Sequence, residues 1–233
     1  MATVLLLRHG RTTANATGGL AGRQPVELDG TGRIQAEKVG VRLRPLPLSE
    51  VVTSPLIRCR QTLELALPDA RPVVDEGLIE CGYGDWEGQP LAKLAKDPLW
   101  RVVQQHPSAA VFPNGEAMAA MSARAVAAIR HWDTEVTAEH GPEALWLACS
   151  HGDVIKAIVA DAMGLHLDEF QRIVADPASV SVIRYTPTRP FLVRLNDTAD
   201  LSALVPPKRR RRRAPRPAAQ SDAAVGGGAG GGV

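Results

Sequence analysis

The sequence predicts an α/β fold, a three-layer sandwich in which a mostly parallel central sheet is flanked by helices. Short apolar runs alternate along the chain with longer segments of helical period, and this alternation is typical of that fold class. Most of the runs are rich in apolar residues, which indicates strands buried mostly on both faces, as in a parallel sheet. With 45% hydrophobic and 22% charged residues among 233, the composition excludes a wholly disordered chain or a fibre.

Five apolar runs are predicted to be strands. The first four, expected to be buried in the sheet, are Thr3–Leu7, Glu50–Thr53, Leu145–Cys149 and Val180–Tyr185. The fifth, Phe191–Leu195, follows soon after the fourth, so we expect the two to pair at an edge of the sheet. An exposed edge strand of this kind could serve a homodimer.

Four helices are expected, at residues 30–44, 56–67, 115–139 and 153–163. The third has the most regular pattern, because its apolar residues recur at spacings of three and four: Met118, Met121, Ala125, Ile129 and Trp132. Each predicted helix lies between two predicted strands, as the crossover connections of a parallel sheet require.

The basic residues are concentrated near the end of the chain. Residues 206–233 hold seven of the 27 Lys and Arg and one of the 25 acids, which leaves 20 basic against 24 acidic residues in 1–205. We therefore expect one mildly acidic domain over 1–205 and a disordered basic, glycine-rich tail over 206–233. Nucleic acid is expected at most as a weak, salt-sensitive partner of that tail.

The apolar runs and the cysteines indicate the compartment. The longest uninterrupted run near the start, Val4–Leu7, is too short for a membrane span or a signal peptide. The three cysteines, Cys59, Cys81 and Cys149, are odd in number and widely spaced, which suits free thiols in a reducing compartment and gives no metal-ligand pattern. We expect a cytoplasmic protein with no membrane partner, no metal and no cofactor.

Polar motifs follow three of the predicted strands directly. The first strand runs into Arg8-His9-Gly10, the second is followed by Arg58 in the first turn of a helix, and the third runs into Ser150-His151-Gly152. The carboxyl ends of parallel strands form the usual ligand-binding edge of such a sheet. Each motif alone is a weak signal, but two arginines and two histidines at one edge predict an anion site.

These motifs resemble the signature of the histidine phosphatase superfamily, the phosphoglycerate-mutase-like proteins. The resemblance extends over about residues 2–196 and rests first on Leu7–Gly10, Ser54–Arg58 and Ser150–Gly152. It is supported by Asn15 and by the segments Leu28–Ala36, Leu78–Gly88 and Phe112–Glu116. Within the superfamily, the chain is most similar to an actinobacterial branch described as phosphomutases.

The resemblance implies a role for each motif residue. His9 would be the nucleophile that forms a phosphohistidine, and Glu80 the acid that protonates the leaving oxygen. Asp85 and Glu87 lie near Glu80 in the sequence and are rival candidates. The phosphoryl oxygens would be bound by Arg8, Asn15, Arg58, His151 and the backbone N–H of Gly152. Thr12 and Arg23 are candidates for the substrate rim.

Departures from the mutases favour hydrolysis. The mutases usually have Glu-Ser after Arg-His-Gly, where this chain has Arg11-Thr12, and Arg-His after the acid, where it has Cys81-Gly82. The cations expected to hold a second phosphate are therefore missing there. We expect a metal-independent phosphatase for a small phosphorylated metabolite, with a phosphomutase as the first alternative and a phospho-ligand binding protein as the second.

Overall fold

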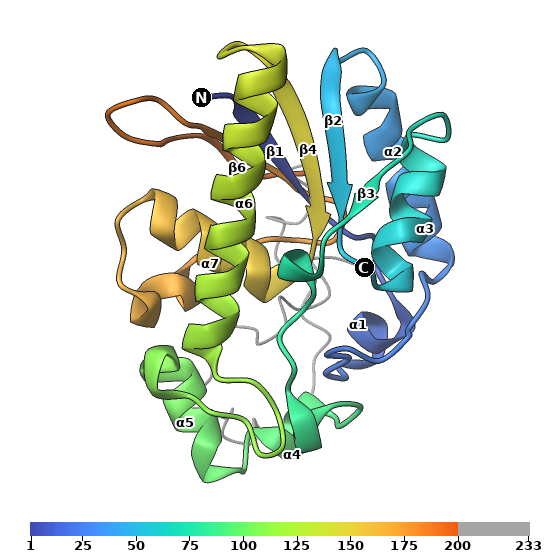
Figure 1. Ribbon diagram of the computed structural model, residues 1–233. Helices are drawn as coiled ribbons and strands as arrows, with labels where there is room; N and C mark the ends of the chain where they lie inside the picture. Colours follow the sequence, from blue (N-terminus) through green and yellow to red (C-terminus); the bar gives the residue numbers. More distant parts are fainter. Residues whose placement is uncertain (200–233) are drawn as a thin grey trace.

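The computed structural model describes residues 1–199 and confirms the predicted sandwich (Figure 1). A six-stranded sheet in the order β3-β2-β4-β1-β5-β6 lies between two layers of helices. Its strands are β1 (Thr3–Arg8), β2 (Leu48–Thr53), β3 (Val73–Val74), β4 (Leu145–Ser150), β5 (Val180–Arg184) and β6 (Phe191–Asp197). The first four run parallel, whereas β5 is antiparallel to β1 and β6 is antiparallel to β5.

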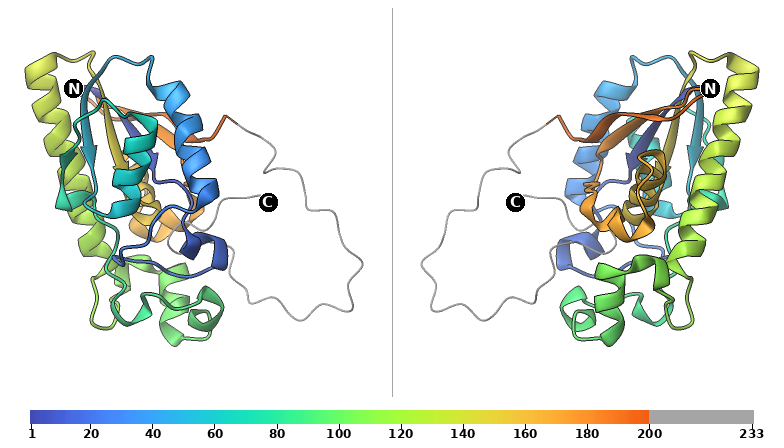
Figure 2. Two further views of the ribbon diagram at one scale, coloured as in Figure 1. Left: turned by 90° about the vertical axis from the view of Figure 1, so that its right-hand side faces the viewer. Right: turned by 90° about the vertical axis from the view of Figure 1, so that its left-hand side faces the viewer.

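Helices cover both faces of the sheet (Figure 2). The helices are α1 (Thr13–Thr17), α2 (Gly30–Leu43), α3 (Ile57–Ala66), α4 (Leu91–Leu94), α5 (Pro98–Gln105), α6 (Met118–His140) and α7 (Gly152–Ala162). Val4 and Leu6 of β1 belong to the core cluster shared with α6 and α7, and Leu5 and Leu7 to the cluster shared with α2 and α3. The uninterrupted apolar run of β1 thus supplies both cores, because successive side chains point to opposite faces.

The sheet is mostly parallel, as predicted, and the sequence left the direction of Val180–Tyr185 open. In the structure, β5 pairs antiparallel with β1. Ile183 and Val180 of β5 are buried in the two different core clusters. Such burial on both faces is the same for either strand direction, so the apolar pattern carries no information about direction. The predicted pairing of the last strand at the sheet edge is confirmed, and Phe191, Val193 and Leu195 of β6 remain about two-fifths exposed.

The structure contains short elements that the sequence did not predict. β3 has two residues, α1 has five and α4 has four, too few to show a hydrophobic period. Within residues 1–199, four 3₁₀ helices are also present, at Glu76–Leu78, Gly84–Trp86, Pro107–Ala109 and Leu167–Arg172. Among the described residues, no helix is both long and apolar enough to cross a membrane. The predicted domain end at 205 and the tail 206–233 lie outside the described residues.

Candidate active site

Three parallel strands bring the predicted phosphate-binding residues together. β1 ends at Arg8 and is followed by His9, whose backbone N–H donates to the carbonyl of Ser150 at the end of β4 (3.0 Å). The rings of His9 and His151 lie with their centroids 5.2 Å apart. Arg58 stands in the first turn of α3, directly after β2, and donates to His151. The predicted histidines and arginines therefore lie together at the carboxyl edge of the sheet.

The tautomer of His9 follows from its hydrogen bond. Nδ1 lies 2.7 Å from the carbonyl oxygen of Gly10, which can only accept, so Nδ1 carries the hydrogen and Nε2 keeps its lone pair. Burial lowers the pKa of His9 well below its ordinary value, and the charges of Arg58 and Arg8 lower it further. His9 is therefore neutral at pH 7, the form that a nucleophile requires.

Close packing explains the glycine after His9. A Cβ at Gly10 would lie 2.5 Å from the carbonyl oxygen of Gly32 in the first turn of α2. A Cβ at Gly32 would in turn collide with the backbone of Arg11. The backbone N–H of Gly10 donates to the hydroxyl of Thr62 on α3 (3.0 Å). Two glycines thus let α2 pack directly against the loop that carries His9. The hydrogen bond to Thr62 fixes the same loop to α3.

The two arginines are buried positive charges. Arg8 donates to the carbonyl of Ala175 (2.7 Å), and Arg58 donates to the carbonyls of Gly22 (2.7 Å) and Gln24 (3.1 Å). Burial lowers the pKa of Arg8 to about 10 and also lowers that of Arg58. Arg8 is still charged at pH 7. Two guanidinium groups that are at most 2% exposed favour a bound anion strongly, because their charges are poorly screened by water.

Arg58 and Ser54 orient His151. Arg58 Nε donates to Nδ1 of His151 (3.2 Å), so in the neutral ring Nε2 carries the hydrogen and donates to Ser54 Oγ (2.6 Å). Burial lowers the pKa of His151 well below its ordinary value, and Arg58 and His9 add to the effect. Gly152 is the first residue of α7, where backbone N–H groups lack partners within the helix.

Glu80 is the buried carboxyl among the three candidate acids. It follows the 3₁₀ helix Glu76–Leu78, is 4% exposed, and accepts a hydrogen bond from the backbone N–H of Cys81 (3.0 Å). Burial raises its pKa to about 7, and the charge of Asp153 contributes to the rise. Asp85 instead accepts from Asn114 (3.0 Å), and Glu87 accepts from the backbone of Tyr83 (3.1 Å). A carboxyl that is half-protonated near pH 7 can both give and take a proton.

The remaining predicted residues take part in local contacts. Thr12 is the N-cap of α1, and its hydroxyl and backbone N–H both bond to the side-chain oxygen of Asn15 (2.8 and 3.0 Å). Arg23 donates to the backbone carbonyl of Glu80 (3.2 Å) and pairs with Glu116 (3.0 Å). Arg23 thus lies beside the acid-bearing segment.

Two groups near Glu80 were not predicted. Arg124 on α6 donates to three backbone carbonyls of the acid-bearing segment, those of Gly77 (2.9 Å), Ile79 (2.7 Å) and Glu80 (3.1 Å). Asp153, Lys156 and Tyr83 form a second group, which is buried and whose Asp153 influences Glu80 electrostatically. The position of Asp153 directly after His151-Gly152 was the available signal for the second group. Within residues 1–199, no three His, Cys, Asp or Glu side chains are arranged to hold a metal ion.

Fold and site together define an α/β protein that collects two neutral histidines, two buried arginines and one carboxyl of raised pKa at the carboxyl edge of its sheet. The model of the histidine phosphatase superfamily (branch 1) matches residues 4–198, and the chain belongs to that family. Its relatives include both phosphatases and probable phosphoglycerate mutases.

Three relatives illustrate this range. An acid phosphatase of Mycobacterium tuberculosis is 33% identical over 183 residues, which cover 77% of this chain and 84% of the relative. A probable phosphoglycerate mutase of Klebsiella pneumoniae is 30% identical over 79% of this chain and 86% of its own length. The solved structure of a mycobacterial glucosyl-3-phosphoglycerate phosphatase in complex with VO3 superposes with a TM-score of 0.73 at 25% identity, covering 83% of this chain and 98% of that one.

Proposed function

We propose that the protein is a cytoplasmic phosphomonoester hydrolase that acts on a small phosphorylated metabolite through a phosphohistidine at His9. The observation that carries the proposal is the hydrogen bond from His9 Nδ1 to the Gly10 carbonyl, which leaves the lone pair on Nε2 beside two buried guanidinium groups. A neutral imidazole next to fixed positive charge is suited to attack a phosphate ester. The free, buried cysteines agree with a reducing compartment.

In the first step, Nε2 of His9 attacks phosphorus, an N–P bond forms, and the bond from phosphorus to the ester oxygen breaks. Protonated Glu80 gives its proton to the departing oxygen. In the second step, Glu80 as carboxylate takes a proton from water, the resulting hydroxide attacks phosphorus, and the N–P bond breaks to release phosphate. Charge on the phosphoryl oxygens is neutralised by Arg8 and Arg58, with further hydrogen bonds from the side-chain amide of Asn15 and the N–H of Gly152. His151 would donate through Nε2, whose hydrogen turns from Ser54 Oγ to a phosphoryl oxygen when substrate binds.

The surroundings of Gly82 favour hydrolysis over phosphoryl transfer between two sites of a sugar or acid. A mutase must hold a second phosphate near this position. Arg23 lies against Gly82, where an added Cβ would come within 3.3 Å of its guanidinium, but Arg23 and Arg124 are both paired with Glu116. Their charge is therefore partly neutralised. Arg23 and Thr12 remain the proposed substrate rim.

Two other functions remain as alternatives. A phosphomutase is favoured by the named mutase relatives, and a non-catalytic phospho-ligand binding protein would share the same anion site. The binding protein is the weaker alternative, because both the proposed nucleophile His9 and the proposed acid Glu80 are present.

The test combines three assays on the purified protein. We expect release of inorganic phosphate from p-nitrophenyl phosphate and from alkyl phosphates, no change in this activity with EDTA, and competitive inhibition by vanadate. Interconversion of 3-phosphoglycerate, with and without 2,3-bisphosphoglycerate, should be negligible beside hydrolysis. Interconversion faster than hydrolysis would establish the mutase. Loss of activity with EDTA that Mg²⁺ or Zn²⁺ restores would overturn the metal-free scheme.

A further inference from the structure

Three buried polar side chains, one on the loop that carries Glu80 and two on α7, have no role in the two steps above. Asp153, Lys156 and Tyr83 are at most 2% exposed. Lys156 Nζ donates to Asp153 Oδ1 (3.1 Å), and the hydroxyl of Tyr83 donates to Asp153 Oδ2 (2.7 Å). Burying a carboxylate and an ammonium costs several kcal/mol per ion, and the attraction between the two often fails to offset that cost. Stability alone is therefore a weak reason for such a pair.

The group connects the acid to the phosphate-binding edge. Tyr83 belongs to the same loop as Glu80, three residues later in the chain, whereas Asp153 stands in the first turn of α7, two residues after His151. The Tyr83–Asp153 hydrogen bond therefore ties the loop that carries the acid to the helix that begins at the phosphate-binding histidine.

Contacts on its far side keep Lys156 in place. Its ammonium donates to the side-chain oxygen of Gln171 and lies 4.5 Å from the centre of the Phe170 ring. Gln171 is itself held by a hydrogen bond from its amide to the carbonyl of Val103 (3.3 Å). Lys156 is thus fixed where its ammonium group faces the carboxylate of Asp153.

We propose that Asp153 is a positioning residue for the general acid: its carboxylate, held by Tyr83 and Lys156, keeps Glu80 protonated in the free enzyme. The inference rests on the proposed phosphatase function, since it concerns the proton that Glu80 gives to the leaving group.

The charges around Glu80 explain why this carboxylate is needed. Arg58 from α3 and Arg8 from β1 favour the ionised form of Glu80, as does the N–H of Cys81. Arg124 from α6 and Arg23 donate to its backbone carbonyl. Burial and Asp153 oppose these groups and bring the pKa to about 7. Without Asp153, burial alone would oppose the guanidinium groups, so a larger fraction of Glu80 would be ionised at neutral pH and less of the enzyme would carry its proton donor.

A purely structural role for Asp153 predicts a different result. A carboxylate in the first turn of α7 also stabilises the helix through its dipole. Loss of that stabilisation would lower the melting temperature but would not change the pH dependence of the reaction. The pH profile therefore separates the two roles.

The experiment is the pH profile of kcat/KM for Asp153→Asn with an alkyl phosphate. Asparagine keeps the size and can still accept from Tyr83, but it removes the charge. We expect the alkaline limb of the profile to move to lower pH by about one unit, and the rate above the limb to fall about tenfold. The rate with p-nitrophenyl phosphate should fall much less, because its leaving group needs no proton. Asp153→Glu, which restores the charge, should return the limb toward the wild type.

Asp161→Asn is the matched control. It removes a carboxylate from the same helix, but Asp161 is paired with Arg130 at the surface (2.7 Å), so the limb should stay in place. If Asp153→Asn does not fold, the double variant D153N/K156M removes both buried charges together. Its limb should also move to lower pH, because Asp153 makes the largest contribution after burial to the proton affinity of Glu80.

A second readout does not depend on catalysis. The carboxyl band of Glu80 can be titrated by infrared difference spectroscopy against Glu80→Gln, and its midpoint should lie near pH 7 in the wild type and lower in Asp153→Asn. An unchanged midpoint and an unchanged limb would overturn the role of Asp153. A shifted midpoint in a protein that hydrolyses no phosphate ester would instead overturn the proposed function and leave the electrostatic link intact.

Discussion

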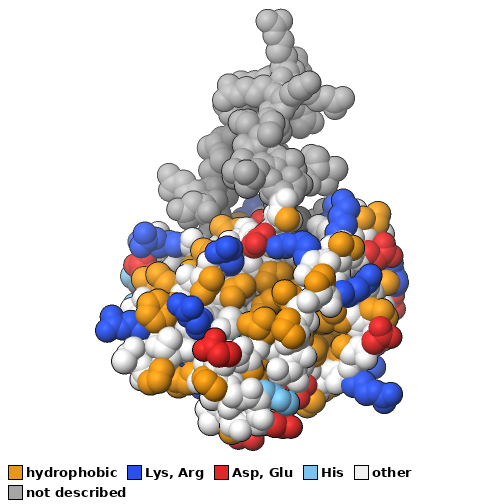
Figure 3. All heavy atoms as spheres, turned by 90° about the horizontal axis from the view of Figure 1, so that it is seen from above, with side chains coloured by type: hydrophobic (Ala, Val, Ile, Leu, Met, Phe, Trp, Pro, Cys, Tyr) orange, Lys and Arg blue, Asp and Glu red, His pale blue; other side chains and the backbone are white. Residues whose placement is uncertain are grey.

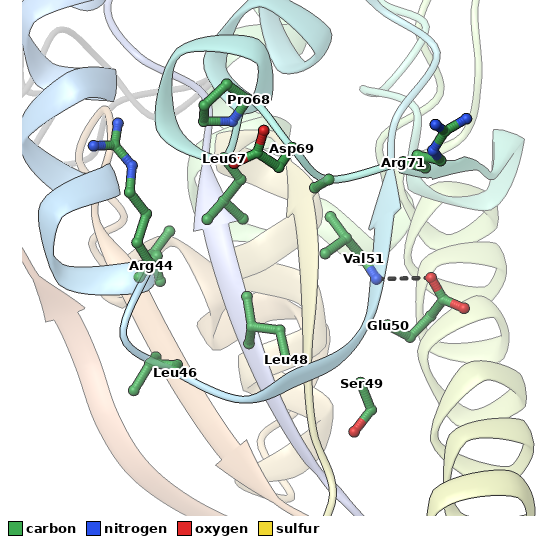
Figure 4. Close-up of a pocket in the computed structure, with 12 residues that line it drawn as sticks. Arg44, Leu46, Leu48, Ser49, Glu50, Val51, Leu67, Pro68, Asp69 and Arg71 are labelled. Carbon is green, nitrogen blue, oxygen red and sulfur yellow. Dashed lines mark hydrogen bonds between the residues drawn. The ribbon is translucent and has the colours of Figure 1, made fainter.

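The two ends of the parallel strands differ in what they bury. At the carboxyl ends lie ionisable side chains that are at most 4% exposed: Arg8, His9, Arg58, Glu80 and His151. At the amino ends, a pocket of about 420 Å³ is bounded by the ends of α2 and α3 and the start of β2 (Figure 4). Its arginines, Arg44 and Arg71, are exposed. Figure 3 looks onto this end of the sheet, where hydrophobic side chains gather among scattered charged ones.

The polar groups at the amino ends have a structural role. Arg44 donates to the carbonyls of Leu65 (3.1 Å) and Ala66 (3.0 Å), which are the last carbonyls of α3. A cation at a helix C-terminus is an ordinary stabilising contact. The size of a pocket therefore does not by itself indicate a functional site in this molecule. Buried ionisable side chains are the better indicator. The two ends should respond in opposite ways to mutation: activity should be lost at the carboxyl ends, and stability at the amino ends.

The largest effect is expected from His9→Ala. Turnover should fall by at least about a thousandfold, because the nucleophile is removed, while the fold should persist. Rapid quenching of the wild type with a phosphorylated substrate should trap an acid-labile phosphoryl group on His9. His131→Ala, on the exposed face of α6, is the control and should behave as the wild type. Retention of a tenth of the activity in His9→Ala would remove His9 from the mechanism.

Glu80→Gln should lower activity and raise stability. Hydrolysis of an alkyl phosphate should slow by about 10²- to 10⁴-fold, because the leaving oxygen receives no proton. The folded pKa of about 7 lies above the ordinary 4.5, so the unfolding free energy of the wild type falls as pH rises between these values. Above pH 7 the wild type has lost about 3 kcal/mol of unfolding free energy in this way. Glutamine does not titrate, so the variant does not undergo this loss.

Denaturant unfolding at two pH values checks this second effect. Glu80→Gln should be the more stable protein at pH 8 and about equal to the wild type at pH 4, where the carboxyl is protonated in both the folded and the unfolded chain. Equal stabilities at pH 8 would mean that nearby positive charges and hydrogen bonds fully offset the cost of burying the Glu80 carboxylate. The two ends of the sheet would then differ less in the cost of their buried charges.

Leu43→Ala tests the amino end. Leu43 is 2% exposed, lines the pocket, and belongs to the core cluster between α2, α3 and the sheet. Its truncation should lower the unfolding free energy by about 2–4 kcal/mol. At a temperature where the variant is folded, kcat/KM should remain within about twofold of the wild type. A tenfold loss of kcat/KM would show that the packing of α2 controls the loop of His9, through the contact between Gly10 and Gly32.

The carboxyl-end site was the more predictable of the two ends. Its histidines and arginines follow directly from buried strands, so the strand prediction also places Arg8, His9 and His151 at one edge. The direction of β5 could not be predicted, because burial on both faces looks the same for either direction. The link between Tyr83 and Asp153 joins residues 70 positions apart and depends on how a loop packs on α7, which no local pattern encodes.

The smallest effect is expected from deleting residues 206–233. The proposed site residues all lie between Arg8 and Gly152, and the segment is rich in Arg, Pro and Gly with few apolar residues. The melting temperature and kcat/KM should therefore be nearly unchanged. Retention on DNA, if the full chain shows any, should be weak, should disappear at high salt, and should be lost with the deletion, since phosphate contacts release counterions.

The opposite result, a deletion that lowers the melting temperature, would also be informative. A shortened protein that melts several degrees lower would mean that residues beyond 205 bury area against the domain, because a shift of that size corresponds to about 1 kcal/mol or more in a domain of this size. The natural place to look for that contact would be β6, whose Phe191, Val193 and Leu195 are partly exposed and which ends two residues before the last described residue. Such a result would move the domain boundary beyond 205, and it would make the exposed sheet edge, like the amino-end pocket, a region that serves stability and not chemistry.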